Sequence, residues 1–269
     1  MIKLIASDMD GTLLDGEGNV PPETFDLIKR LKTAGIGFVA SSGRRFDTLQ
    51  ELFAPVSSEM DFVASNGAQV VVAGQLVDRE VFSHAALRRL KNVTDLFDGL
   101  HLVVFDKISY LLDDEERFER ELDKNLPNPL RVRDLPRPDT SIIKASIYVD
   151  DAVMDMAYIL EREMGEDFVF APSGRKWIDV MQHGVSKATG IKQVMEARHA
   201  RAEEVVAFGD SMNDSFAAKN ARISALLVKT GYNEGIAIDQ WAKEYAPNDL
   251  VFDTMAQLAD HVIKTERRN

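Results

Sequence analysis

Residues 3–14, with the sequence KLIASDMDGTLL, carry the strongest signal for the fold of this chain. A short apolar run suited to a buried parallel strand ends in two carboxylates, Asp8 and Asp10, followed by Gly11. Side chains alternate along a strand, so both carboxylates are expected to lean the same way at its carboxyl end. Because close anions repel and burial makes each charge more costly, the pair indicates a bound cation or a shared proton. The alternative interpretation is an ordinary solvated junction between a strand and a turn.

Strands and helices alternate on both sides of this motif. The sequence predicts strands at 2–7, 37–41 and 61–64, separated by helices that begin at Pro22 and near Phe46. The alternation resumes late in the chain, with strands at 205–208 and 224–228 and a terminal helix at 255–263. This repetition predicts an α/β fold, a Rossmann-like core sheet of parallel strands with right-handed crossovers. Functional side chains of such sheets gather at the carboxyl ends of the strands.

In residues 83–183 the regular alternation of strands and helices gives way to hairpin-like strands mixed with helices. This predicts an inserted α+β domain between core segments 1–82 and 184–269. The elements expected within it are a helix at 85–97, a hairpin at 101–105 and 109–112, an acidic helix at 114–125, a proline-rich loop at 127–138, a strand at 142–149, a helix at 152–164, and strands near 168–170 and 177–181. Linkers are expected near Phe82 and His183. Because the insertion leaves and re-enters at the carboxyl edge of the sheet, we expect it to cover that edge as a cap.

Composition limits the classes of partner. The net charge of the 269-residue chain is −12 and no long basic run offsets it, which argues against nucleic acid. The absence of cysteine excludes disulfides and thiolate metal sites and fits a reducing compartment. No apolar run approaches the roughly 20 residues that cross a bilayer, and the first residues enter a predicted core strand without a signal peptide. We therefore expect a soluble cytoplasmic protein without a membrane partner; the oligomeric state is not indicated.

Three further segments add chemically related residues. Ser42 and Gly43 form a strand-to-helix turn, where a hydroxyl and backbone N–H groups suit an anion. Lys187 lies at a predicted helix start, and Asp210 and Asp214 follow a late strand. Each has a simpler interpretation: an ordinary turn, a solvated lysine, and acids that cap a helix. In this order along the chain, however, they indicate one site for phosphoryl transfer, with carboxylates for a hard divalent cation and positive groups for a phosphate.

These motifs resemble those of the haloacid dehalogenase (HAD) superfamily, and within it the Cof-type phosphatases that carry a large α/β cap of the C2 type. The resemblance spans the chain and rests on residues 8–14, 42–44, 66–68, 184–187 and 209–214. It implies a HAD-like core with a cap inserted after the third core strand. Ser42 stands where many members have threonine, and Ser211-Met212 replaces a commoner pair. The stretch 231–253 fits the usual ending of the family poorly.

The resemblance also implies roles for individual residues. Asp8 would be the nucleophile and Asp10 the general acid and base. The implied Mg²⁺ ligands are Asp8, Asp10, Asp210 and Asp214. The residues implied to bind the phosphoryl group are Met9, Ser42, Gly43, Lys187 and Asn213. Tentative substrate contacts are Asn66, Arg45 and Arg175, although a basic residue in a turn is more often simply solvated.

The expected function is that of a Mg²⁺-dependent phosphatase. It would hydrolyse phosphate monoesters of small metabolites, with sugar phosphates as the class suggested by the resemblance, through an aspartyl-phosphate intermediate. A phosphomutase on the same scaffold is one alternative, which the large cap makes less favoured. A non-catalytic phosphate-binding regulatory module is another, against which the intact Asp8, Asp10, Lys187 and Asp210 argue. The specific substrate is not encoded in any residue pattern.

Overall fold

The computed structural model describes residues 2–112, 129–173, 176–209, 212–222, 224–228 and 250–252, with the backbone alone at 212–213, 215–217, 224–228 and 250–252. The chain forms two compact units. The first comprises residues 1–78 and 186–269, and the second comprises residues 79–185. The second unit is thus an insertion in the sequence of the first.

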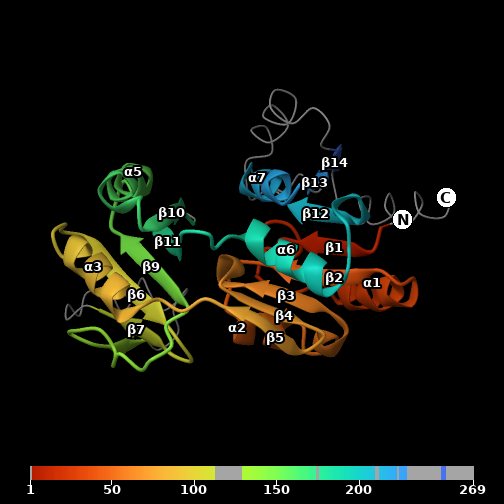
Figure 1. Cartoon of the computed structure of the whole chain (residues 1–269), viewed down its shortest axis with the longest axis horizontal. Coiled ribbons are helices and arrows are strands. Elements are labelled where there is room, and N and C mark those ends of the chain that lie inside the picture. The colour runs from red at the N-terminus through yellow and green to blue at the C-terminus, as the bar shows by residue number, and fades with distance from the viewer. Residues whose placement is uncertain are drawn as a thin grey trace. The chain divides into compact units, whose positions relative to one another are not determined.

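The first unit is built on a mainly parallel sheet (Figure 1). Within the described ranges its eight strands lie in the order β14-β13-β12-β1-β2-β3-β4-β5. Their bounds are β1 (Leu4–Ser7), β2 (Gly37–Ser41), β3 (Asp61–Ala64), β4 (Gln69–Val72), β5 (Gln75–Arg79), β12 (Val205–Gly209), β13 (Ser224–Val228) and β14 (Leu250–Phe252). Each neighbouring pair from β14 to β3 is parallel, and β4 runs antiparallel to β3. The predicted α/β fold with a Rossmann-like sheet is therefore confirmed.

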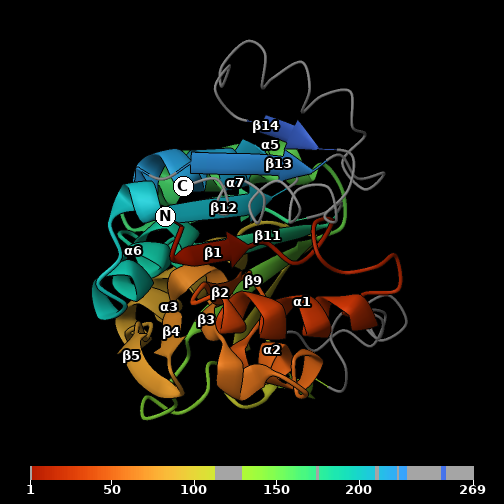
Figure 2. The same cartoon turned by 90° about the vertical axis from the view of Figure 1, so that its right-hand side faces the viewer.

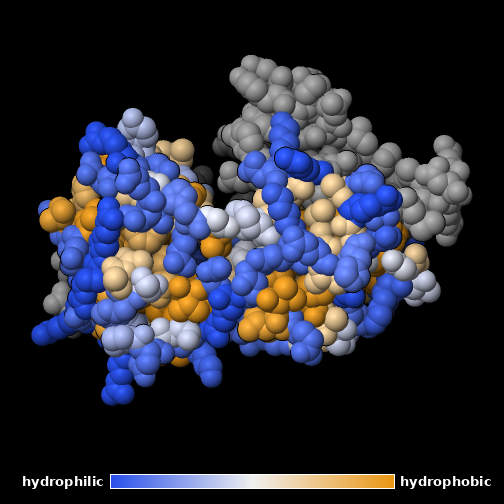
Figure 3. All heavy atoms as spheres, in the orientation of Figure 1, coloured by the Kyte–Doolittle hydropathy of each residue, from blue (hydrophilic) through white to orange (hydrophobic). Residues whose placement is uncertain are grey.

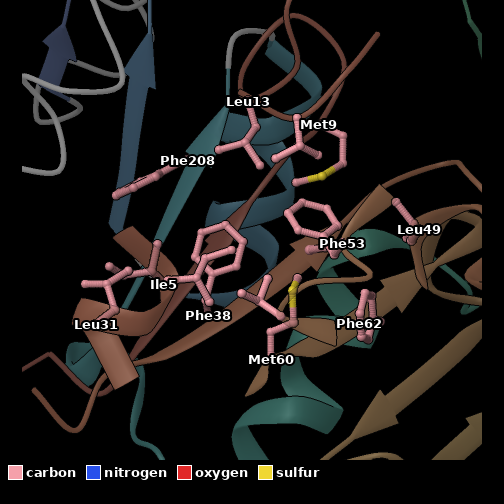
Figure 4. Packing of buried hydrophobic residues seen from close by; sticks show 14 of the residues in the cluster. Ile5, Met9, Leu13, Leu31, Phe38, Leu49, Phe53, Met60, Phe62 and Phe208 are labelled. Carbon is pink, nitrogen blue, oxygen red and sulfur yellow. The ribbon is translucent and has the colours of Figure 1, made fainter. Parts of the chain in front are cut away.

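Helices cover both faces of this sheet because successive strand side chains point to opposite faces. Ile5 of β1 packs in the cluster that includes side chains of α1 (Pro22–Thr33) and α2 (Phe46–Leu52). Its neighbours Leu4 and Ala6 pack in the opposite cluster, with α6 (Lys187–Ala197) and α7 (Met212–Ala221). Figures 2 and 4 show the helices around the strands and the packing of the first cluster. Asp8 has the same parity as Leu4 and Ala6, so β1 directs it toward the side of α6 and α7.

The second unit has a sheet of the antiparallel type with helices against it. Within the described ranges the order is β10-β11-β9-β6-β7-β8, and only β7 and β8 pair in parallel. The bounds are β6 (Leu100–Phe105), β7 (Ser109–Leu111), β8 (Leu130–Arg131), β9 (Lys144–Val149), β10 (Phe168–Pro172) and β11 (Trp177–Gln182). Two helices, α3 (His84–Thr94) and α5 (Val153–Met164), pack in one apolar cluster with alternate residues of β6 and β9.

Some elements differ from the sequence-based expectation. Strands β4 and β5 were not predicted, and β8 lies in the segment expected to be a proline-rich loop. Phe82, expected at a linker, is buried in the apolar cluster of the second unit, where its N–H donates to the Ile142 carbonyl at 2.8 Å. The helices expected at 114–125 and 255–263 lie outside the described residues. Despite the atypical stretch 231–253, β14 continues the parallel sheet beside β13.

The surface carries both hydrophilic and apolar side chains. On the face drawn in Figure 3, hydrophilic side chains surround smaller apolar areas. Exposed apolar side chains include Leu76 and Val77 on β5 and Tyr158 on α5. A helix with the length and hydropathy to cross a membrane does not occur in the part of the chain that the structure describes.

Candidate active site

A buried group of three charged residues lies at the carboxyl end of β1. Asp8 directly follows β1, Lys187 is the first residue of α6, and Asp214 lies in the first turn of α7. The Lys187 ammonium donates to Asp8 Oδ1 at 2.6 Å and to Asp214 Oδ1 at 2.9 Å. The side chains of Asp8 and Asp214 are only 11% and 7% exposed. Asp8, 179 positions before Lys187 in the sequence, and Asp214, 27 positions after it, therefore converge on one nitrogen atom.

The two carboxylates keep Lys187 charged. Burial alone would lower the pKa of the ammonium, but the negative charges of Asp214 and Asp8 and their hydrogen bonds outweigh it and raise the pKa. Two carboxylates and one ammonium still leave the group with a net negative charge. Because opposite charges attract strongly where little water screens them, such a group is a favourable place for one further cation.

Close backbone packing fixes the position of Lys187. Ser186 caps α6, since its Oγ accepts the Thr189 N–H at 3.1 Å. Gly67 lies against this cap with a φ of +99°, and a Cβ atom there would lie 2.1 Å from the Ser186 carbonyl oxygen. Any other residue at position 67 would push the start of α6 away from β3. Gly209, at the end of β12, is equally restricted, because a Cβ atom there would lie 2.2 Å from the Asp214 Cβ. A larger residue at position 209 would push Asp214 and the start of α7 away from β12.

Asp10 lies apart from this buried group and has a different partner. Its carboxylate accepts two hydrogen bonds from the Arg44 guanidinium, from Nε to Oδ2 at 2.9 Å and from Nη2 to Oδ1 at 2.6 Å. Asp10 is half exposed, and it follows Asp8 by two positions in the turn after β1. Arg44 belongs to a motif that the sequence analysis quoted without giving the residue a role. The pairing joins two turns 34 residues apart, which no local pattern reports.

The Ser42–Arg44 turn uses its donors differently from the prediction. The Ser42 N–H donates to the Val63 carbonyl at 2.9 Å, and the Arg44 N–H donates to Ser42 Oγ at 3.1 Å. The Ser42 N–H, one of the groups expected to hold an anion, is thus bonded within the protein. The Ser42 hydroxyl, which accepts one bond, can still donate its own proton. The helix that follows begins only at Phe46.

The remaining predicted site residues lie in varied places. The Met9 side chain is fully buried in the core (Figure 4), and its carbonyl accepts N–H groups of the following turn. Asn66 has a φ of +55° and donates its N–H to the Ser42 carbonyl at 2.9 Å. Arg45 directly precedes α2 and pairs with Asp47. Asn213 is on α7 and its side chain is not described, while Gly43 lies in the turn beside Ser42. Asp210 and Arg175 lie outside the described residues.

The donor set fits a hard divalent cation. Carboxylate oxygens are the ligands that Mg²⁺ prefers, and the net negative charge of the buried group favours such an ion. No set of three acidic, histidine or cysteine side chains arranged for a metal is found within the described ranges. Asp8 and Asp214 supply two carboxylates, so Asp210, just after β12, is the candidate for a third.

Comparison with known proteins identifies relatives that match most of the chain. The family model for haloacid dehalogenase-like hydrolases matches residues 5–227. The 5-amino-6-(5-phospho-D-ribitylamino)uracil phosphatase YbjI of Escherichia coli (strain K12) is 29% identical over 92% of this chain and 99% of its own. The Bacillus subtilis (strain 168) phosphatase YcsE, named for the same substrate, is 25% identical over 84% of each chain.

Solved structures show the same fold. A phosphatase of the haloalkanoate (HAD) enzyme superfamily from Bacteroides thetaiotaomicron superposes with a TM-score of 0.76 over 98% of this chain and 95% of its own, at 21% identity. A second structure, a sugar phosphatase of HAD subclass IIB, superposes with a TM-score of 0.75 over 97% of this chain and 98% of its own, at 16% identity.

Proposed function

The chain belongs to the haloacid dehalogenase-like hydrolases, and from that premise we propose that it is a Mg²⁺-dependent phosphatase of small phosphorylated metabolites. The reaction would pass through an aspartyl phosphate on Asp8. The observation that carries this proposal is the Lys187 ammonium held between the buried carboxylates of Asp8 and Asp214. The relatives named as phosphatases support the same reaction class.

In the first step, an oxygen of the Asp8 carboxylate attacks the phosphorus atom of the ester. The bond from phosphorus to the leaving oxygen breaks, and Asp10 gives that oxygen a proton. The Lys187 ammonium and the Ser42 hydroxyl would stabilise the phosphoryl oxygens as charge spreads over them. The buried position of Lys187 strengthens this effect, because little water competes for its charge.

In the second step, a water molecule attacks the phosphorus of the aspartyl phosphate. Asp10, now a carboxylate, takes a proton from the water as the bond between phosphorus and the Asp8 oxygen breaks, which restores the Asp8 carboxylate and releases inorganic phosphate. Asp8, Asp10, Asp210 and Asp214 would hold the Mg²⁺. When bound, this ion offsets the repulsion between the Asp8 anion and the phosphate dianion.

Substrate choice is assigned to the inserted segment, residues 83–183, acting with Arg45 and Asn66 of the core. Arg175 remains the candidate within the insertion for a second charged group of the substrate. The relatives named for a phosphoribityl compound suggest polyol and sugar phosphates as the first class to test.

The test is a screen of phosphate monoesters with Mg²⁺, read by release of inorganic phosphate. The panel contains p-nitrophenyl phosphate and a series of polyol, sugar and nucleoside monophosphates. Release from at least one alkyl phosphate is expected. Phosphate transfer between sugar positions without net release would instead indicate a phosphomutase, and binding without turnover a regulatory module.

A second measurement tests the covalent intermediate. Adding an alcohol such as methanol lets the aspartyl phosphate react with water or with the alcohol. A common intermediate predicts the same ratio of the two products for every leaving group. A ratio that changes with the leaving group would contradict the aspartyl phosphate while leaving the phosphatase activity established.

A further inference from the structure

The two-point contact between Arg44 and Asp10 fixes the direction of a carboxylate. The guanidinium is planar, and its Nε and Nη2 atoms donate to both Asp10 oxygens at 2.9 and 2.6 Å. Such a pair of parallel bonds sets the plane of the carboxylate as well as its position. Among the residues that the structure describes, no other one hydrogen-bonds to these two oxygens. Arg44 is thus the group that orients Asp10.

Arg44 is itself tied to two neighbouring strand ends. Its N–H donates to Ser42 Oγ at 3.1 Å, just after β2. Its carbonyl accepts the Ser65 N–H at 2.8 Å, just after β3. Ser65 and Asn66 have φ values of +50° and +55°, a conformation that non-glycine residues adopt at an energetic cost. The backbone of Arg44 is therefore held in place by a strained turn, which fixes the position of the Cα atom from which its side chain extends.

The pair is placed poorly for a role in stability. The side chains of Arg44 and Asp10 are 31% and 48% exposed. Exposed ion pairs contribute little to folding, because water competes for both charges. Orientation is a different matter, because proton transfer depends steeply on the placement of the donor relative to the leaving oxygen.

We infer that Arg44 is a positioning residue that aims the Asp10 carboxyl at the leaving oxygen. This inference rests on the proposed phosphatase function. It predicts that loss of Arg44 lowers kcat most for substrates whose leaving group needs a proton. An alkoxide leaves poorly without one, whereas p-nitrophenolate leaves readily.

The experiment compares two substrates with the variant Arg44→Gln. The substrates are p-nitrophenyl phosphate and the alkyl phosphate that the wild type hydrolyses fastest. Because general acid catalysis contributes about 10²–10⁴-fold, we expect kcat for the alkyl phosphate to fall at least tenfold more than kcat for p-nitrophenyl phosphate. KM for both substrates should change little, since Arg44 is not assigned to phosphate binding.

Three further variants make the result specific. In Arg44→Lys the positive charge stays but the planar fork is lost, so the selective defect should persist. In an Asp10→Asn background, Arg44→Gln should add no further selective loss, because both changes remove one function. The matched control is Arg198→Gln, which removes the arginine of another two-point pair, with Asp61 at the start of β3, and should leave both rates unchanged.

Several outcomes would overturn the inference. An equal fall in kcat for both substrates would point to a structural effect, and a rise in KM alone would make Arg44 a phosphate ligand. Unchanged rates in Arg44→Gln, or wild-type rates in Arg44→Lys, would show that the two-point contact of the guanidinium is not needed to orient Asp10. Circular dichroism and thermal melting of each variant separate these cases from unfolding. A wild type that hydrolyses no ester overturns the proposed function itself, and this inference with it.

Discussion

The strand pair β1–β12 carries a charged cluster at each end, and the two clusters differ in the burial of their cations and in their balance of charge. At the amino end, Lys3 and Arg201 both contact Glu204, at 3.0 and 3.2 Å. At the carboxyl end, Lys187 contacts both Asp8 and Asp214. Arg201 also contacts Glu203, so two cations face two carboxylates at the amino end, whereas two carboxylates share one cation at the carboxyl end.

The surroundings of the cations separate the roles. Lys3 and Arg201 are 48% and 70% exposed, so water solvates both cations at the amino end. Lys187 is 19% exposed, so water solvates the charged groups at the carboxyl end much less. The cluster at the amino end therefore has a structural role, in which its ion pairs join the starts of β1 and β12. The cluster at the carboxyl end has reactive carboxylates and a demand for positive charge, which a phosphate site with a metal ion would use.

The largest expected effect comes from Asp8→Asn. The amide is a poor nucleophile, so turnover of p-nitrophenyl phosphate should fall by at least about 10³-fold. The fold should persist, because an amide oxygen can still accept the Lys187 hydrogen bond. Glu204→Gln at the amino end is the matched carboxylate-to-amide control and should leave turnover unchanged. Near-wild-type hydrolysis by Asp8→Asn would make the nucleophile assignment wrong.

Removal of the metal should have the next largest effect. In excess EDTA, hydrolysis should fall by about 10²-fold or more, and added Mg²⁺ should restore it. Excess Ca²⁺ should inhibit, since it prefers more ligands at longer distances than Mg²⁺. Circular dichroism in EDTA checks that the loss is not unfolding. Full activity in the chelator would refute the metal requirement.

The comparison of the two ends can be measured directly as stability. Lys187→Met leaves two buried carboxylates without their counter-ion, so in EDTA the free energy of unfolding should fall by about 3 kcal/mol. Millimolar Mg²⁺ should recover part of this loss. Lys3→Met should lower it less, because Lys3 is half exposed and Glu204 keeps Arg201. Urea unfolding of both variants gives the difference, and equal losses would erase the distinction between the two ends.

The smallest effect is a pH dependence at the amino end. The Arg201 N–H, the Lys3 ammonium and the Arg201 guanidinium lower the pKa of Glu204 from 4.5 to about 2. A lowered pKa means that the carboxylate stabilises the fold fully above pH 4.5 and loses this effect as the pH falls toward 2. The difference in melting temperature between the wild type and Glu204→Gln should therefore shrink over that range. A difference that stays constant or grows on acidification would contradict it.

The sequence allowed correct prediction of those features that rest on local patterns. Buried strands such as β2 and β3 are short apolar runs that end in turn residues, so their bounds matched the expectation. The family resemblance, which depends on short motifs, is also confirmed. In contrast, β4 and β5 follow the turns at Asn66-Gly67 and Ala73-Gly74, whose positive φ values suit hairpins but which were not interpreted as hairpin signals. Strand β8 has two residues in a proline-rich segment, and it forms because tertiary pairing outweighs local propensity.

In the candidate site, too, residues in local motifs were predicted, whereas contacts set by tertiary structure were not. The sequence analysis selected Asp8, Lys187 and Asp214 together, although their roles stay predictions. It did not foresee that N–H groups of the Ser42 turn bond within the protein, because such bonds depend on how β2 and β3 are aligned. It also gave Arg44 no role, since the distance between Arg44 and Asp10 is set by two turns that meet only in the folded chain.

The central place of β1 in its sheet has a consequence for synthesis of the chain on the ribosome. Leu4 pairs with Gly37 on one side and with Val205 on the other, so one neighbour of β1 emerges early and the other very late. All of β1–β5 and the entire second unit are made before Lys187 and β12 exist. During that time the nascent chain carries Asp8 without its counter-ion and β1 with one edge unpaired. Catalytic competence should therefore appear only in the last stage of translation, after the second unit has had the chance to fold.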